Sequence, residues 1–130
     1  MKIKIAIITF LLLLDAGLAI FLAVYNQEEF TGSRERCFDT YIADIERMNG
    51  SDLHPLTLNA GEDLEIRFET QKGSLRMAIK AQDGTILYSG DGKYAPAFTL
   101  YIKDSGIYTV EVKARHAKGK IYIKPKEKTL

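Results

Sequence analysis

Residues 64–80 read Leu-Glu-Ile-Arg-Phe-Glu-Thr-Gln-Lys-Gly-Ser-Leu-Arg-Met-Ala-Ile-Lys. Apolar side chains alternate with polar ones on both sides of Lys72-Gly73, first at even-numbered positions and then at odd-numbered ones. Strict alternation is typical of a β-strand that buries one face. The segment therefore predicts two strands, each with its apolar side chains toward a core.

The change from even to odd positions constrains how these two strands pair. Because a one-residue slip turns every side chain to the opposite face, a loop of even length must join them. A loop over residues 71–74 would place Glu69 opposite Arg76 and Glu65 opposite Lys80. Each such cross-strand charge pair contributes about 0.2–1 kcal/mol. The charges therefore favour a hairpin at this point.

The same alternation continues on either side of this segment. Apolar positions alternate over residues 56–58, 86–88, 98–102, 108–114 and 121–123, with turn residues in the gaps. Asp83-Gly84 is a strong signal for a two-residue hairpin. The pattern predicts a mainly β chain, an antiparallel β-sandwich or barrel of about seven strands over residues 55–130, jelly-roll or immunoglobulin-like in arrangement.

Residues 104–112, Asp-Ser-Gly-Ile-Tyr-Thr-Val-Glu-Val, resemble the Asp-x-Gly/Ala-x-Tyr-x-Cys stretch of immunoglobulin-like domains. In that family the tyrosine hydroxyl bonds to nearby backbone in a tyrosine corner, so the resemblance implies this role for Tyr108. Val110 stands where the family has its second disulfide cysteine. The run from Leu56 to Ile123 is also similar to bacterial pre-peptidase C-terminal and GOLD-type sandwiches. These resemblances imply a binding or structural accessory module, not an enzyme.

The N-terminal region has the composition of a membrane anchor. Lys2 and Lys4 precede an apolar run over residues 5–24 in which Asp15 is the only charged residue. At about 1.5 Å per residue, a helix over this run spans roughly 30 Å, the hydrocarbon thickness of a bilayer. Residues 1–25 therefore predict a single membrane-spanning segment, with the N-terminus cytoplasmic and the remainder extracytoplasmic because the lysines precede the run. A signal peptide, with secretion after cleavage, is the alternative.

Asp15, Ala19 and Ala23 recur at four-residue spacing within this run. On a helix they share one face. Small residues allow helices to approach closely, and an ionisable group inside a membrane usually faces a partner. The pattern predicts a helix–helix contact with another membrane protein; a tolerated charge, or the polar end of a signal peptide, is the other interpretation.

Residues 26–54 form a predicted connector that contains a short amphipathic helix. The helix is predicted for residues 33–48 from the i, i+3, i+4, i+7 spacing of Phe38, Tyr41, Ile42, Ile45 and Met48. Cys37, the single cysteine of the chain, would lie on it. It is interpreted either as a half-buried thiol or as a link between two copies in a homodimer.

Charge is distributed unevenly along the chain. Residues 26–69 carry 4 Arg and 11 Asp+Glu, whereas residues 70–130 carry 12 Lys+Arg and 5 Asp+Glu. By alternation, a set of basic and tyrosine side chains faces away from the core: Tyr101, Lys113, Lys120, Tyr122 and Lys124. This set is either a solvated face that protects an edge strand or a surface for an anionic envelope polymer, glycan or lipid headgroup. Nucleic acid is not expected as a partner, because the predicted location is extracytoplasmic and binding signatures are missing.

Nothing in the sequence has the spacing of a catalytic or metal site. Asp83, Asp91 and Asp104 sit in turns, where aspartate ordinarily bonds to backbone. His54 and His116 are the only histidines, and both are predicted to be exposed. We therefore expect no catalysis, no metal and no cofactor. The sequence predicts a membrane-tethered interaction module for another membrane or envelope protein, with the anionic-polymer module as the alternative.

Overall fold

The structure, a computed structural model, describes Leu18, Ile20 and residues 27–127 of the 130-residue chain. Leu18 and Ile20 are helical. Among the described residues, no helix has the length and apolar character needed to span a bilayer. Asp15, Ala19 and Ala23, predicted to contact another helix, lie outside the described residues.

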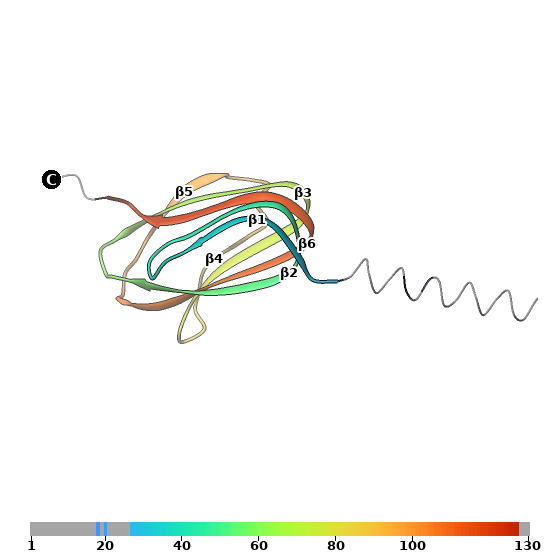
Figure 1. Cartoon of the computed structure of the whole chain (residues 1–130). Helices are drawn as coiled ribbons and strands as arrows, with labels where there is room; N and C mark the ends of the chain where they lie inside the picture. The colour runs from blue at the N-terminus through green and yellow to red at the C-terminus, as the bar shows by residue number, and fades with distance from the viewer. Residues whose placement is uncertain (1–17, 19, 21–26, 128–130) are drawn as a thin grey trace, which may run out of the picture.

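Within residues 27–127, six strands form one antiparallel sheet in the order β1-β2-β6-β3-β4, with β5 also paired to β3 (Figure 1). The predicted mainly β, antiparallel class is confirmed. The prediction of about seven strands over residues 55–130 is wrong, because the described residues form six strands, of which β1 and most of β2 precede residue 55. The strands are β1 (Glu29–Arg36), β2 (Tyr41–Leu58), β3 (Asp63–Ala81), β4 (Ile86–Gly90), β5 (Ala97–Tyr101) and β6 (Gly106–Pro125).

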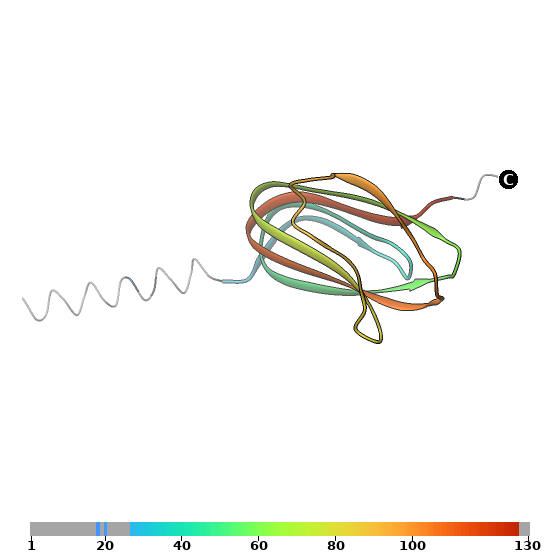
Figure 2. The same ribbon diagram turned by 180° about the vertical axis from the view of Figure 1, so that it is seen from behind.

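Register shifts interrupt the three longest strands at one level of the sheet. The β2–β6 pairing shifts between Ile45 and Gly50, and the β3–β6 pairing shifts between Thr70 and Ser74. At this level β2, β3 and β6 curve back over themselves, as Figures 1 and 2 both show. We call this level the bend end; it comprises residues 45–50, 70–74 and 114–119.

The bend divides the sheet into two halves that enclose the core. Half A consists of β1, β5 and residues 41–48, 63–70 and 117–125. Half B consists of β4 and residues 50–58, 74–81 and 106–114. One buried apolar cluster takes side chains from both halves, among them Phe68 and Ile123 of half A and Leu56 and Val112 of half B.

β3 buries even-numbered side chains before the bend and odd-numbered ones after it: Leu64, Ile66 and Phe68, then Leu75, Met77 and Ile79. The predicted buried faces on both sides of Lys72-Gly73 are therefore confirmed. The hairpin predicted there is wrong, because β3 continues through this point. A bulge adds a residue to one strand and so changes which face its side chains meet, without a turn. The partners of Glu65 and Glu69 are Lys124 and Lys120 of β6, not the predicted Lys80 and Arg76.

The amphipathic helix predicted over residues 33–48 is also wrong. This segment contains the second half of β1, a turn and the first part of β2, and the predicted boundary between residues 54 and 55 falls inside β2. Tyr41 and Ile45 are buried by strand alternation, and the register shift after Ile45 brings Met48 to the same face. A bulge thus changed a spacing of two into one of three, which resembles helical periodicity. Phe38, the first residue of the predicted apolar face, is 73% exposed.

Two local predictions are confirmed. A hairpin joins β3 to β4 at Asp83-Gly84, but its loop is longer than the two residues predicted, because the Ala81 amide donates to the Thr85 carbonyl oxygen at 2.8 Å and leaves residues 82–84 between them. The Tyr108 hydroxyl donates to the backbone oxygen of Asp104 at 2.5 Å, which is the contact of a tyrosine corner.

The predicted exposure of His54 is wrong. Its side chain is buried against Tyr41, with the ring centroids 5.5 Å apart, and its Nε2 lies 2.7 Å from the backbone oxygen of Cys37. Because strand alternation continues through Pro55 to Leu56, position 54 faces the core.

Candidate functional site

An open groove of about 480 Å³ lies over the outer face of half A. Neighbouring residues of four segments line it, because β2, β6 and β3 are adjacent in the sheet and the chain before β5 runs beside β3. The outward-facing residues that line the groove are Ile42, Asp44, Arg67, Glu69, Pro96, Ala97, Lys120 and Tyr122.

The groove combines apolar surface with charges of both signs. Register places Lys120 opposite Asp44 on one side and opposite Glu69 on the other. The Arg67 guanidinium lies 5.1 Å from the centre of the Tyr122 ring. Arg67 Nη2 also pairs with Glu65 Oε1 at 2.8 Å, just beyond the groove. The groove lining therefore carries two carboxylates and two cations, and its charges balance.

The structure brings together three of the five residues that the sequence predicted as a binding surface. Lys120, Tyr122 and Lys124 follow one another at alternate positions on the outer face of half A. Tyr101 is 65% exposed at the end of β5, opposite Asp63, so β3 separates it from that row.

Lys113 lies apart from the other four, on the outer face of half B. Its Nζ is 3.2 Å from Glu111 Oε1, and Lys80 Nζ is 2.9 Å from Glu111 Oε2. Hydrogen bonds from Lys80 and then Lys113 hold the pKa of the Glu111 carboxyl below its usual range. Arg76 lies opposite Lys113 across the strands. The bend in β6 between residues 114 and 117 accounts for the separation of Lys113 from Lys120.

Sequence reasoning did not identify most of the groove. Ile42 was assigned to a helix, and Glu69 was paired with Arg76 instead of Lys120. Asp44 and Ala97 had no local signal, since only long-range register brings them near Tyr122. Alternation along β6 alone was sufficient to place Lys120 and Tyr122 on one face.

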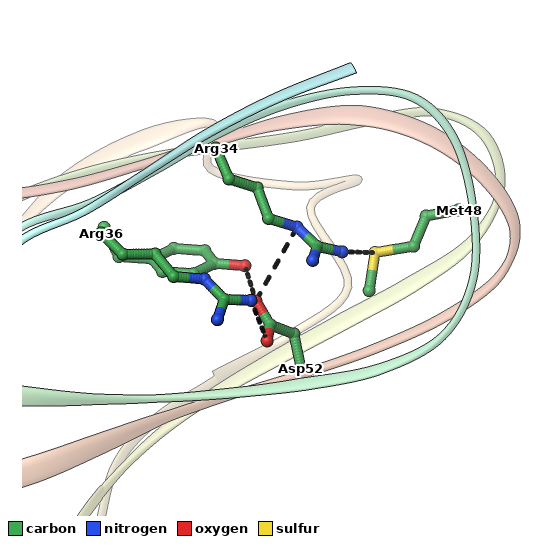
Figure 3. A network of polar contacts seen from close by, with 5 residues as sticks. Arg34, Arg36, Met48 and Asp52 are labelled. Carbon is green, nitrogen blue, oxygen red and sulfur yellow. Dashed lines mark hydrogen bonds and ion pairs between the residues drawn. The ribbon is translucent and has the colours of Figure 1, made fainter. Parts of the chain in front are cut away.

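A second polar arrangement joins the two halves, centred on Asp52 (Figure 3). Its carboxylate pairs with Arg36 Nη2 and lies 3.9 Å from Arg34 Nε, both on β1. The Tyr41 hydroxyl donates to Asp52 Oδ2 at 2.8 Å. Burial, followed by the hydrogen bond to Asp52 and the charge of Asp52, raises the pKa of Tyr41 above its usual value, against the smaller effect of the two arginines.

Arg34 is further held by apolar neighbours. Its guanidinium carbon lies 3.5 Å from the centre of the Phe30 ring, and its Nη2 lies 3.8 Å from Met48 Sδ. This arrangement fastens β1 to half B. Because Asp52 pairs with Arg34 and Arg36 within the fold, we assign this arrangement a structural role.

Cys37 lies in the turn between β1 and β2 and is exposed. The half-buried interpretation is therefore wrong, since the thiol is outside the strands and away from the core. The homodimer link through Cys37 stays a prediction.

No protein-family model matches this chain, and no curated protein matches its sequence. Among solved structures, it is similar to one described as the crystal structure of accessory secretory protein 1,2 and 3 in Streptococcus pneumoniae. The sequence identity is 16% and the TM-score 0.35, over 75% of this chain and 90% of that one. A likeness of this degree carries no statement about function.

Proposed function

We propose that this protein is a membrane-tethered, extracytoplasmic, non-catalytic module that binds a segment of another membrane or envelope protein in the groove over half A. The balanced charge of the groove is the observation that carries this proposal. Ile42, Tyr122 and Ala97 supply apolar contact, while Asp44 and Lys120 supply one charge of each sign. Protein segments offer apolar and oppositely charged side chains together, and complementary charges fix their register.

The tether is proposed from the apolar run over residues 5–24 and the lysines that precede it. Within the tether, Asp15, Ala19 and Ala23 are proposed to contact a helix of the same partner. We also propose that the domain is related to immunoglobulin-like and similar accessory sandwiches. The tyrosine corner at Tyr108 supports this relation.

The alternative is a module that binds an anionic envelope polymer. The observation that favours it is the row Lys120, Tyr122 and Lys124 on one face of β6. Against it, Glu69 lies opposite Lys120 and Glu65 opposite Lys124, so a polyanion on this face would meet a carboxylate beside each lysine. We therefore favour a protein segment.

Two opposite charge reversals separate these functions. The first variant is Lys120→Glu with Lys124→Glu; the second is Asp44→Lys with Glu69→Lys. A polyanion binds the first variant less tightly and the second more tightly, because only cations attract it. A protein segment that matches both signs binds both variants less tightly.

The measurement is recovery of the partner with the full-length protein from its native membrane, in parallel with binding of isolated envelope polymers. Tighter polymer binding by the Asp44→Lys, Glu69→Lys variant would support the alternative and contradict the proposal. Arg76→Glu with Lys113→Glu, on the outer face of half B, is the matched control and should leave binding unchanged.

A further inference from the structure

The bend end carries an unbalanced group of cations. Three exposed cations lie there: Lys72 of β3, and Arg115 and Lys118 of β6. None of the three forms an ion pair with another residue in the described part of the chain. The sequence contains no acidic residue between Glu69 and Asp83 or between Glu111 and Glu127. β3 and β6 therefore carry only basic charges at the bend, and the β4–β5 connection beside Thr70 adds one charge of each sign, Asp91 and Lys93.

Two of these cations face each other. Lys72 lies directly opposite Lys118 in the β3–β6 pairing, and Ser74 lies opposite Arg115 one step further along. Like charges at opposite positions destabilise a sheet. An anionic partner that lies across both lysines offsets this repulsion.

The β1–β2 side of the bend is different. Glu28, Glu29 and Glu46 are acidic, and Glu29 Oε1 pairs with Arg47 Nε at 2.9 Å. The bend end thus has one basic side and one mixed side, so a flat anionic surface is expected to contact the β3–β6 side.

The chain enters the fold at this same end. Glu29, the first residue of β1, pairs with Asn49 beside the bend in β2 (Figure 1). The C-terminal end of β6 lies at the opposite end, where the Lys126 amide donates to the backbone oxygen of Asp63. Residues 25–28 separate the apolar run from β1, and four residues extend at most about 14 Å. A tether of this length keeps the bend end close to the bilayer surface, where electrostatic attraction acts over a Debye length of about 8 Å.

We propose that the basic side of the bend end, formed by Lys72, Arg115 and Lys118, rests on anionic lipid headgroups of the membrane that holds the tether. This inference rests on the tether of the proposed function. It orients the domain: the bend end faces the membrane, and the groove over half A opens to the side, within reach of a neighbouring membrane protein.

The experiment uses the full chain in vesicles of phosphatidylcholine alone or mixed with phosphatidylglycerol. With Cys37→Ser as background, a donor fluorophore is attached at Gln71→Cys in the bend end or at Glu127→Cys at the far end, and energy transfer to a headgroup-labelled lipid is measured. We expect transfer from position 71 to rise when phosphatidylglycerol is present and to fall again at high salt. Energy transfer from position 127 should be the same in both vesicle compositions.

Paired variants identify the cations. Lys72→Glu with Lys118→Glu should abolish the rise at position 71, whereas Lys103→Glu with Lys126→Glu, an equal change of charge at the far end, should leave it intact. If the charge reversals impair folding, Lys72→Gln with Lys118→Gln and the salt titration of the unaltered chain give the same comparison.

Flotation of the same vesicles distinguishes a failure of the headgroup contact from a failure of the tether. Transfer at position 71 that is equal in both lipids, from a chain that floats with the vesicles, would overturn the headgroup contact and leave the tether standing. A chain that does not float would overturn the tether and the headgroup contact with it.

Discussion

The Tyr41 hydroxyl donates a hydrogen bond of 2.8 Å to the carboxylate of Asp52, which lies on the same strand but beyond the bend. Tyr41 belongs to half A and Asp52 to half B, so this bond joins the two halves of the sheet. Arg34 and Arg36 reach the same carboxylate from β1. One side chain thus connects the edge strand to the half of the sheet with which it is not paired.

We expect Asp52→Ala to destabilise the fold by about 2–4 kcal/mol, because it removes the ion-pair partner of two guanidinium groups and the hydrogen-bond acceptor of a buried hydroxyl. The Asp52 side chain is only 9% exposed, so water compensates little. The denaturant midpoint of the full chain, followed by circular dichroism, measures this loss. Glu46→Ala, an exposed carboxylate on the same strand, is the control; equal midpoints for the two variants would contradict the structural role of Asp52.

Alkaline pH should weaken the fold through Tyr41. Its pKa is raised in the folded state, so the folded chain holds the phenolic proton more tightly than the unfolded chain does. This contribution to stability is complete below about pH 10, the unfolded value, and is lost as pH rises from there toward the folded-state pKa.

Tyr41→Phe should therefore show a shallower decline of unfolding free energy above that pH. Part of the decline remains, since burial also raises the pKa of Tyr88 and Tyr108. Tyr94→Phe, at a site 83% exposed, should retain the full decline. If unfolding free energy declines with pH as steeply in Tyr41→Phe as in the unaltered chain, this explanation is contradicted.

Gly73 tests whether the bend depends on close backbone contact. Its φ is +70°, and a Cβ added there would lie 2.1 Å from the His116 backbone oxygen. Gly61 has a similar φ of +88° but nothing within 4 Å of such a Cβ. Gly61→Ala should cost about 1 kcal/mol from backbone conformation alone. Gly73→Ala should cost distinctly more, about 2–4 kcal/mol. Similar unfolding midpoints for the two variants would contradict the dependence of the bend on this close backbone contact.

The tyrosine corner should make a modest contribution. Tyr108→Phe removes the 2.5 Å hydrogen bond to Asp104 while it keeps the ring in the core. We expect a loss of about 1 kcal/mol in unfolding free energy. Tyr101→Phe, whose side chain is 65% exposed, provides the baseline for loss of a phenolic hydroxyl. Equal stability of the two variants would leave the Tyr108 hydroxyl without a structural role.

Local alternation was enough to identify most of the core, because the three long strands, β2, β3 and β6, each bury one face. Leu64, Met77 and Val110 were all assigned to the core from spacing alone. The hairpin at Asp83-Gly84 and the contact of Tyr108 were also predictable, since both depend on residues close in sequence.

The bends were not predictable, because a bulge within a long strand has the same pattern as two strands and a turn. At Lys72-Gly73, and at Lys118-Gly119 in the gap between the alternating segments 108–114 and 121–123, glycine and charge suggested loops where β3 and β6 continue. The groove was not predictable either, because its lining depends on how strands distant in the sequence pair. Asp44 approaches Lys120 only through the β2–β6 register, which no local pattern contains.

Site-specific crosslinking tests the binding groove most directly. A photoreactive residue is placed at Ala97, in the groove, or at Thr57, on the outer face of half B, in the full-length protein in its native membrane. We predict that position 97 yields an adduct with one defined protein, that Asp44→Lys and Lys120→Glu each reduce it, and that position 57 yields none. Equal adducts from both positions, or none from position 97, would contradict the assignment of the groove as the binding site.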